Sequence, residues 1–188
     1  MVDNRSRLPT RALLLALFAI GRINRLCLLD RNTFFAEANN VGVAAMSREA
    51  QLVLLLNSDI EIRDGSWLRR LIEMHERGAI SYGLVETGPC LRADGYCFLI
   101  DRDLYLTYGL DETLQWWWSV TKLQARLLRD EYMVQAVREH DDLVVHFGGK
   151  SGTAFVGASG MNTDEAEIAA WFDDHAVVVH DRVGVNTG

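Results

Sequence analysis

The amino-acid sequence predicts an α/β fold: a doubly wound, mostly parallel sheet with helices on both faces. Helical and strand patterns alternate along the chain, one central strand is apolar throughout, and acidic residues follow two of the expected strands. Strands covered on both faces are typically apolar without alternation, and alternating strands and helices favour a parallel sheet. The 188 residues, 49% of them hydrophobic, suffice for one domain with a buried core.

Residues that typically start or end helices and strands set the limits of the expected elements. Pro9 suits the first turn of a helix, and Gly21 can end that helix. Ser66 can cap a later helix that Gly78 ends, and Leu52–Leu56 is the uninterrupted apolar run. The expected elements are, in order, a strand end at 2–6, a helix at 9–20, a strand at 25–29, a helix at 34–47, a strand at 52–56, a helix at 67–77, a strand at 79–85, an apolar segment at 95–100, a helix at 114–128, a strand at 132–137, a helix at 162–172 opened by a capping box, and a short strand at 177–179.

Composition and charge exclude several classes of protein. The formal net charge of −7 argues against a nucleic-acid-binding protein, which normally carries a basic surface. The apolar stretch at 12–20 is far shorter than the roughly 20 residues that span a membrane, so it predicts a buried helix and no membrane span. The three cysteines form no CxxC pair, which is typical of reduced thiols in a cytoplasmic protein.

Two acidic residues are expected at the sheet edge where α/β folds bind ligands. Asp3 follows the first strand end and Asp59 follows the apolar strand. A carboxylate in such a place needs a cation or hydrogen-bond donors. Asp59 could therefore bind a hard divalent metal that holds a diphosphate, or it could cap the turn that follows the strand. The spacing leaves both alternatives open.

Six ordered segments resemble the family 2 glycosyltransferases, over residues 2–152. The segments are Val2-Asp3-Asn4-x-Ser6, Asn32-x-x-Phe35-Ala36-x-Ala38-Asn39-Asn40-x-Gly42, Leu54-Leu55-Leu56-Asn57-Ser58-Asp59, Arg92-x-x-Gly95-Tyr96-Cys97-Phe98-Leu99-Ile100, Gly109-Leu110-Asp111-Glu112 and His146-Phe147-Gly148-Gly149-Lys150-Ser151. The resemblance implies a nucleotide-diphospho-sugar transferase fold that lacks its first strand. It also implies a catalytic domain at 1–152, followed at 153–188 by a helical tail packed on that domain.

The activity implied by the resemblance is metal-dependent, inverting transfer of a hexosyl group. The donor would be a UDP- or dTDP-sugar and the acceptor a growing glycan or lipid-linked sugar in the cytoplasm, as in polysaccharide and cell-wall synthesis. By resemblance, Asp3, Asn39 and Asn57 contact the nucleotide sugar, and Asp59 contacts both the donor and the metal. His146 is the additional metal ligand, and a mixed oxygen and imidazole site favours Mn²⁺ over Mg²⁺.

The expected catalytic base departs from the family pattern. The Glu-Asp pair of the family aligns with Ser119-Val120, and valine cannot accept a proton. Asp111 and Glu112 on the preceding loop, and Asp94, are therefore the candidate bases. For the acceptor we expect Gly95 together with Trp117 and Trp118.

Three other features of the sequence give weaker evidence about function. Successive positions on a helix point about 100° apart, so Trp116, Trp117 and Trp118 cannot share one face, and at least one is expected in the core. The GGKS segment at 148–151 does not fit a phosphate-binding loop, because Val144 stands where the motif needs glycine. His75 and His140 lie in no partner pattern and are predicted at the surface.

Two alternatives to an active transferase remain open. Val120 and the absent first strand favour a degenerate, non-catalytic relative that binds a sugar nucleotide or a partner protein. The absent strand also allows a sheet completed by another chain, and hence a homo-oligomer, because an unpaired strand edge is prone to pairing.

Overall fold

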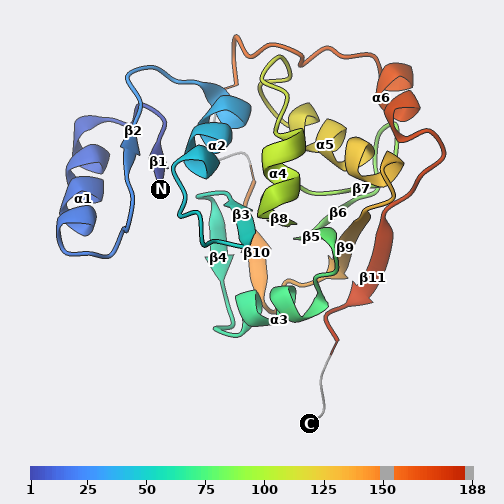
Figure 1. Cartoon of the computed structure of the whole chain (residues 1–188), viewed down its shortest axis with the longest axis horizontal. Helices are drawn as coiled ribbons and strands as arrows, with labels where there is room; N and C mark the ends of the chain where they lie inside the picture. The colour runs from blue at the N-terminus through green and yellow to red at the C-terminus, as the bar shows by residue number, and fades with distance from the viewer. Residues whose placement is uncertain (149–154, 185–188) are drawn as a thin grey trace.

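The computed structural model describes residues 1–148 and 155–184 and has a five-stranded central sheet (Figure 1). The strand order is β11-β9-β5-β8-β3. The strands are β3 (Leu52–Leu56), β5 (Gly78–Tyr82), β8 (Cys97–Asp101), β9 (Met133–Glu139) and β11 (Val178–Arg182). Neighbours β5, β9 and β11 run parallel, whereas β8 is antiparallel to both β3 and β5. The α/β class is confirmed, and the sheet is mixed where a mostly parallel one was predicted.

Helices lie on both faces of this sheet. The helices α2 (Phe34–Ala44), α4 (Arg102–Tyr108) and α5 (Trp118–Arg129) contribute to one apolar cluster with the strand residues Phe98 and Ile100. On the other face, α3 (Trp67–Met74) packs with Leu99 and Ile80. Consecutive residues of β8 thus enter opposite clusters, which is why its sequence is apolar throughout.

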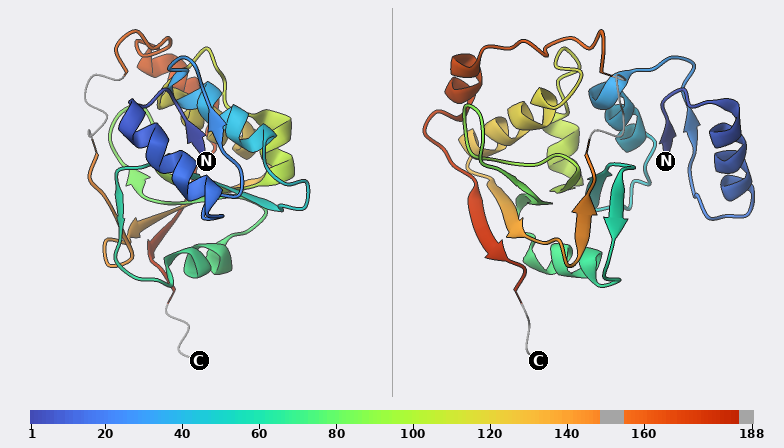
Figure 2. Two further views of the ribbon diagram at one scale, coloured as in Figure 1. Left: turned by 90° about the vertical axis from the view of Figure 1, so that its left-hand side faces the viewer. Right: turned by 180° about the vertical axis from the view of Figure 1, so that it is seen from behind.

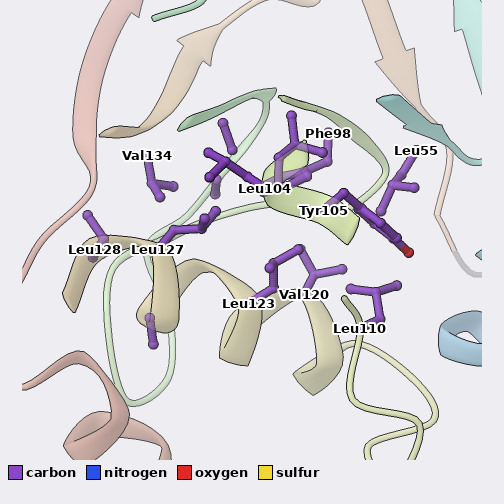
Figure 3. Packing of buried hydrophobic residues seen from close by; sticks show 14 of the residues in the cluster. Leu55, Phe98, Leu104, Tyr105, Leu110, Val120, Leu123, Leu127, Leu128 and Val134 are labelled. Carbon is purple, nitrogen blue, oxygen red and sulfur yellow. The ribbon is translucent and has the colours of Figure 1, made fainter. Parts of the chain in front are cut away.

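Helix α5 is the main cover of the first face. Val120, Leu123 and Leu127 recur at helical spacing, are almost fully buried, and point toward the sheet (Figure 3). Opposite them lie Phe98 of β8 and Val134 of β9. The packing of α5 on the sheet fixes the position of the N-terminal end of this helix, which borders the candidate site.

Two further strand pairs are short. β4 (Ile60–Ile62) pairs antiparallel with β10 (Val144–His146), and β6 (Leu84–Val85) pairs antiparallel with β7 (Arg92–Ala93). Neither β4 nor β10 was expected from the sequence. Three residues separate the end of β3 from the start of β4, and the β4–β10 ribbon positions the site.

The N-terminal residues form a separate unit. β1 (Val2–Asp3) pairs in parallel with β2 (Cys27–Leu28) outside the central sheet, with α1 (Leu8–Ala19) between them in sequence. Figures 1 and 2 show this unit to one side of the sheet, with α2 between. α1 buries none of its residues, so the prediction of a buried helix at 12–20 is wrong. β3, expected as a central strand, is an edge of the sheet.

The C-terminal segment contributes to the domain in two ways. The side chain of Asp164 caps α6 (Glu165–Phe172) by accepting from the backbone N–H of Ala166, at 2.8 Å. Ile168 and Phe172 of α6 are buried, and β11 extends the central sheet beside β9. The predicted boundary between 152 and 153 lies outside the described residues. Within residues 1–148 and 155–184, we find no helix long and apolar enough to cross a membrane.

Replacing Gln124 by methionine is expected to destabilise the fold. The buried Gln124 amide donates to the carbonyl of Ala93 and accepts from its N–H, both at 2.9 Å, and so ties α5 to β7. Methionine leaves buried backbone groups unpaired, at a cost of about 1–3 kcal/mol each. Urea unfolding should therefore show a lower free energy of unfolding for Gln124→Met. The exposed Gln51→Met is the matched control, and an equal loss in both variants would contradict this account.

Candidate functional site

A cavity of about 290 Å³ opens beyond the end of β3 and beside the N-terminal end of α5. It combines carboxylate, imidazole and amide groups with a wall of aromatic side chains. The lining residues are Phe35, Asn57, Asp59, Asp94, Gly95, Tyr96, Trp116, Trp117, Val120, His146 and Phe155. Among the predicted site residues, the cavity brings together Asn57, Asp59, Asp94, Gly95, Trp117 and His146.

Asp59 and His146 form a pair at this cavity. Nε2 of His146 lies 3.3 Å from Oδ1 of Asp59, and the two side chains are 25% and 13% exposed. The ribbon sets this distance, because His146 of β10 is opposite Ile60 of β4 and the N–H of Phe147 donates to the carbonyl of Asp59 at 3.0 Å. Two residues far apart in the sequence are thus held together by backbone hydrogen bonds.

The chemistry of this pair suits a divalent cation. A carboxylate oxygen and an imidazole nitrogen are donors that Mn²⁺ accepts, and Mg²⁺ is usually held by one or two carboxylates plus phosphate oxygens. Across residues 1–148 and 155–184, no group of three or more His, Cys, Asp or Glu side chains could hold a metal. Asp59 and His146 could supply two ligands to a cation, with ligand or water oxygens completing the coordination.

Asp94 and Gly95 lie at the cavity wall against α5. The Asp94 carboxylate accepts from the N–H of Gly95 at 2.6 Å, and the Asp94 carbonyl accepts from the Ser81 hydroxyl at 2.5 Å. A Cβ at residue 95 would lie 3.1 Å from Val120, so the absence of a side chain at Gly95 lets α5 approach this closely. Val120 is consequently an apolar wall of the cavity next to Asp94.

The other two candidate bases, Asp111 and Glu112, form hydrogen bonds away from the cavity lining. Asp111 accepts from the Lys122 ammonium at 2.7 Å and from the N–H and hydroxyl of Thr113. Burial raises the pKa of Asp111, but the hydrogen bonds from Lys122 and Thr113 outweigh burial and lower it to about 2. Glu112 accepts from the Asn40 amide at 2.9 Å. Neither carboxylate belongs to the cavity lining described above.

The predicted nucleotide contacts Asp3 and Asn39 also lie away from the cavity lining. Asp3 is buried on β1, where it accepts from Arg11 at 2.6 Å and from the N–H of Ser6 at 3.1 Å. Burial raises the pKa of Asp3, and the bonds from Ser6 and Arg11 reverse this and lower it. The Asn39 amide donates to the carbonyl of Phe35 within α2.

Of the three consecutive tryptophans, two line the cavity. Trp117 is 49% exposed, and Trp116 lies with its ring centroid 6.2 Å from that of Phe155. Trp118 points elsewhere, with the Arg92 guanidinium 5.2 Å from its ring centroid, and so does not join the predicted acceptor set at the cavity. Phe35 and Phe155, which the sequence did not single out, complete the aromatic wall.

The surface placement predicted for His75 is wrong, whereas His140 is half-buried. The His75 side chain is only 9% exposed, and its Nε2 lies 3.3 Å from Oδ2 of Asp101. Burial lowers the pKa of His75, and Asp101 opposes this shift in part. Nε2 of His140 is hydrogen-bonded to the Tyr96 hydroxyl, and its Nδ1 lies against the carbonyls of Val137 and Arg138. Of the GGKS segment, residues 149–151 lie outside the described part of the chain.

No family model and no curated protein matches the sequence. Among solved structures, the fold is similar to that of the mannosyltransferase PcManGT from Pyrobaculum calidifontis, solved in complex with GDP-Man and Mn²⁺. The TM-score is 0.59 at 16% sequence identity, over 80% of this chain and 48% of that chain. The chain has a glycosyltransferase-like fold. It spans about half the length of PcManGT, and at this identity the likeness concerns the fold.

Replacing Lys122 by methionine is expected to raise the pKa of Asp111 from about 2 toward its ordinary 3.8. Because the folded-state pKa is depressed, the ionised carboxylate stabilises the fold above about pH 4, and this contribution is lost as the pH falls toward 2. The stability difference between wild type and Lys122→Met should therefore be largest near neutral pH and vanish in acid. NMR titration of Asp111 gives the pKa directly, and Lys122→Arg, which keeps the cation, is the control. A wild-type pKa near 3.8 would contradict the assignment.

Proposed function

We propose that the protein is a metal-dependent, inverting glycosyltransferase that moves a sugar from a nucleotide-sugar donor to a glycan or lipid-linked acceptor. The observation that carries the proposal is the pair of Asp59 and His146, held 3.3 Å apart at a cavity that also contains Asp94. The glycosyltransferase-like fold and the six sequence segments support it. The same resemblance supports a cytoplasmic reaction in polysaccharide or cell-wall synthesis.

Asp59 and His146 are assigned to the metal. When bound, the divalent cation neutralises the negative charge that develops on the departing nucleoside diphosphate. Asp59 would supply a carboxylate oxygen and His146 an imidazole nitrogen to such an ion, and diphosphate oxygens would supply further ligands. Asn57 lies two residues before Asp59 in the same cavity and is positioned to donate its amide to the donor.

Asp94 is assigned as the general base. It accepts the proton of the acceptor hydroxyl while the acceptor oxygen bonds to the anomeric carbon and the bond to the diphosphate oxygen breaks. Among the three predicted carboxylates, Asp94 is the one at the cavity, whereas Asp111 and Glu112 are bound to Lys122 and Asn40. The short bond from the Gly95 N–H orients one carboxylate oxygen, and we assign the other oxygen to the acceptor hydroxyl.

The aromatic wall is assigned to the acceptor sugar. The half-exposed ring of Trp117 and the neighbouring Trp116 offer apolar faces against which a sugar ring can lie. Gly95 keeps the adjoining backbone free of a side chain, and the cavity between the aromatic wall and Asp94 suits one sugar ring. The resemblance favours a UDP- or dTDP-sugar as donor.

A second candidate function is a non-catalytic protein that binds a sugar nucleotide. Val120 favours it, because this 3% exposed side chain lines the cavity at the position where the family carries its acidic pair. Under this hypothesis, Asp59 and His146 still bind the cation and the nucleotide, but no acceptor is deprotonated. Nucleotide-sugar binding and sugar transfer therefore have to be measured separately.

Purified protein with Mn²⁺ is expected to hydrolyse or transfer from at least one of the UDP-, dTDP- and GDP-sugars. Asp59→Ala should abolish Mn²⁺ binding, because it removes the one carboxylate of the ligand pair. Asp94→Asn should lower kcat by about 10²- to 10⁴-fold with Mn²⁺ affinity unchanged, the usual range for a lost general base. Calorimetry with Mn²⁺ and a donor-consumption assay measure the two effects.

Glu61→Gln is the matched control for Asp59→Ala, because Glu61 lies on β4 two residues further along and its side chain is 49% exposed. Identical behaviour of Asp59→Ala and wild type, with no turnover of any donor, would reject the transferase proposal. Tight nucleotide-sugar binding that needs Asp59, without turnover, would select the non-catalytic alternative.

A further inference from the structure

Tyr96 contacts the ring of His146 face to face. The two ring centroids are 4.3 Å apart and the planes differ by 17°. Tyr96 directly precedes β8, lines the cavity, and is only 4% exposed. Since Nε2 of this imidazole faces Asp59, the plane of the Tyr96 ring constrains the direction of a nitrogen that is assigned to the metal.

His140 in turn holds the hydroxyl of Tyr96. Nδ1 of His140 lies 3.0 Å from the carbonyl oxygens of both Val137 and Arg138. Carbonyls only accept, so Nδ1 carries the proton, and Nε2 is left to accept a hydrogen bond from the Tyr96 hydroxyl. Burial, reinforced by Cys97 and Asp94, raises the pKa of Tyr96, so its hydroxyl stays a donor at neutral pH.

The backbone of Tyr96 is tied to the other metal-binding segment. Its carbonyl accepts from the N–H of Asn57 at 2.8 Å, two residues before Asp59. One residue therefore contacts both parts of the candidate metal site, through its backbone on the Asp59 side and through its ring on the His146 side. A change in the Tyr96 ring is therefore expected to alter the orientation of the His146 imidazole and to leave the Asp59 carboxylate in place.

Building on the proposed function, we propose that Tyr96, anchored by His140, is a positioning residue that holds the His146 imidazole in the orientation in which it binds the divalent cation. Neither residue touches the cation. Partners of this kind, which orient a ligand, typically change metal affinity by 10- to 100-fold when they are removed.

The test measures Mn²⁺ binding by electron paramagnetic resonance, in wild type, Tyr96→Leu and Tyr96→Phe. The dissociation constant comes from the signal of free Mn²⁺, and the nitrogen-14 coupling of bound Mn²⁺ reports an imidazole ligand. Tyr96→Leu removes the stacked ring and should weaken binding by about 10- to 100-fold and diminish the coupling. Tyr96→Phe keeps the stack, loses the bond to His140, and should weaken binding by a smaller factor.

Tyr82→Phe is the matched control. The Tyr82 ring also stacks on His140, at 5.7 Å and 13°, but its hydroxyl donates to the carbonyl of Trp67. This variant loses a buried hydroxyl without touching His146, so its Mn²⁺ affinity and nitrogen coupling should match wild type. Equal weakening in Tyr82→Phe and Tyr96→Phe would overturn the proposal, because it would indicate a general loss of packing.

His146→Ala separates this inference from the proposed function. If wild type binds no Mn²⁺, or if its nitrogen coupling persists in His146→Ala, the metal site itself is wrong and the inference fails with it. If His146→Ala loses the coupling but Tyr96→Leu keeps both the coupling and the wild-type dissociation constant, the metal site stands and the positioning role is overturned. A lowered Tm in Tyr96→Leu with unchanged Mn²⁺ binding likewise overturns it.

Discussion

The candidate site depends on the backbone pairing between β4 and β10. This short ribbon brings a carboxylate at the end of β3 within 3.3 Å of an imidazole that lies 87 positions later in the chain. A mostly buried carboxylate is costly unless it meets a cation or donors, and the ribbon supplies a partner without burying either group completely. Because the pairing is made by main-chain hydrogen bonds, the distance between Asp59 and His146 does not rely on a flexible side chain.

The opposite wall of the cavity is set by the close approach of α5 to Gly95. The helix is anchored by apolar packing on the sheet and by the amide of Gln124, which pairs with both backbone groups of Ala93. Asp94 follows Ala93 directly, so the same contact that docks the helix also fixes the backbone of the proposed base. The proposed metal ligands and the proposed base thus lie in the lining of one cavity, and a ligand bound there would meet a preformed arrangement.

The sequence predicts the parts of this structure that have local signals. Helix α3 follows from its apolar spacing and β3 from its apolar run, but the Ser66 side chain makes no cap hydrogen bond, and α3 ends at Met74 and not at Gly78. The direction of β8 carries no such signal, because an apolar strand reads the same in a parallel or an antiparallel pair. The ribbon of β4 and β10 is too short for a pattern. The contact of Tyr96 with His140 joins residues 44 positions apart, so it could not be predicted from their neighbours.

Val120 is an apolar part of the cavity wall beside Asp94. An apolar side chain stands where the resemblance leads one to expect a carboxylate, and a Cβ at Gly95 would lie 3.1 Å from it. Valine cannot accept a proton, whereas Asp94, which lines the same cavity, is a carboxylate that accepts a backbone hydrogen bond. The proposed base is therefore Asp94, which lies at the cavity wall against which α5 packs, and not a residue of the helix itself.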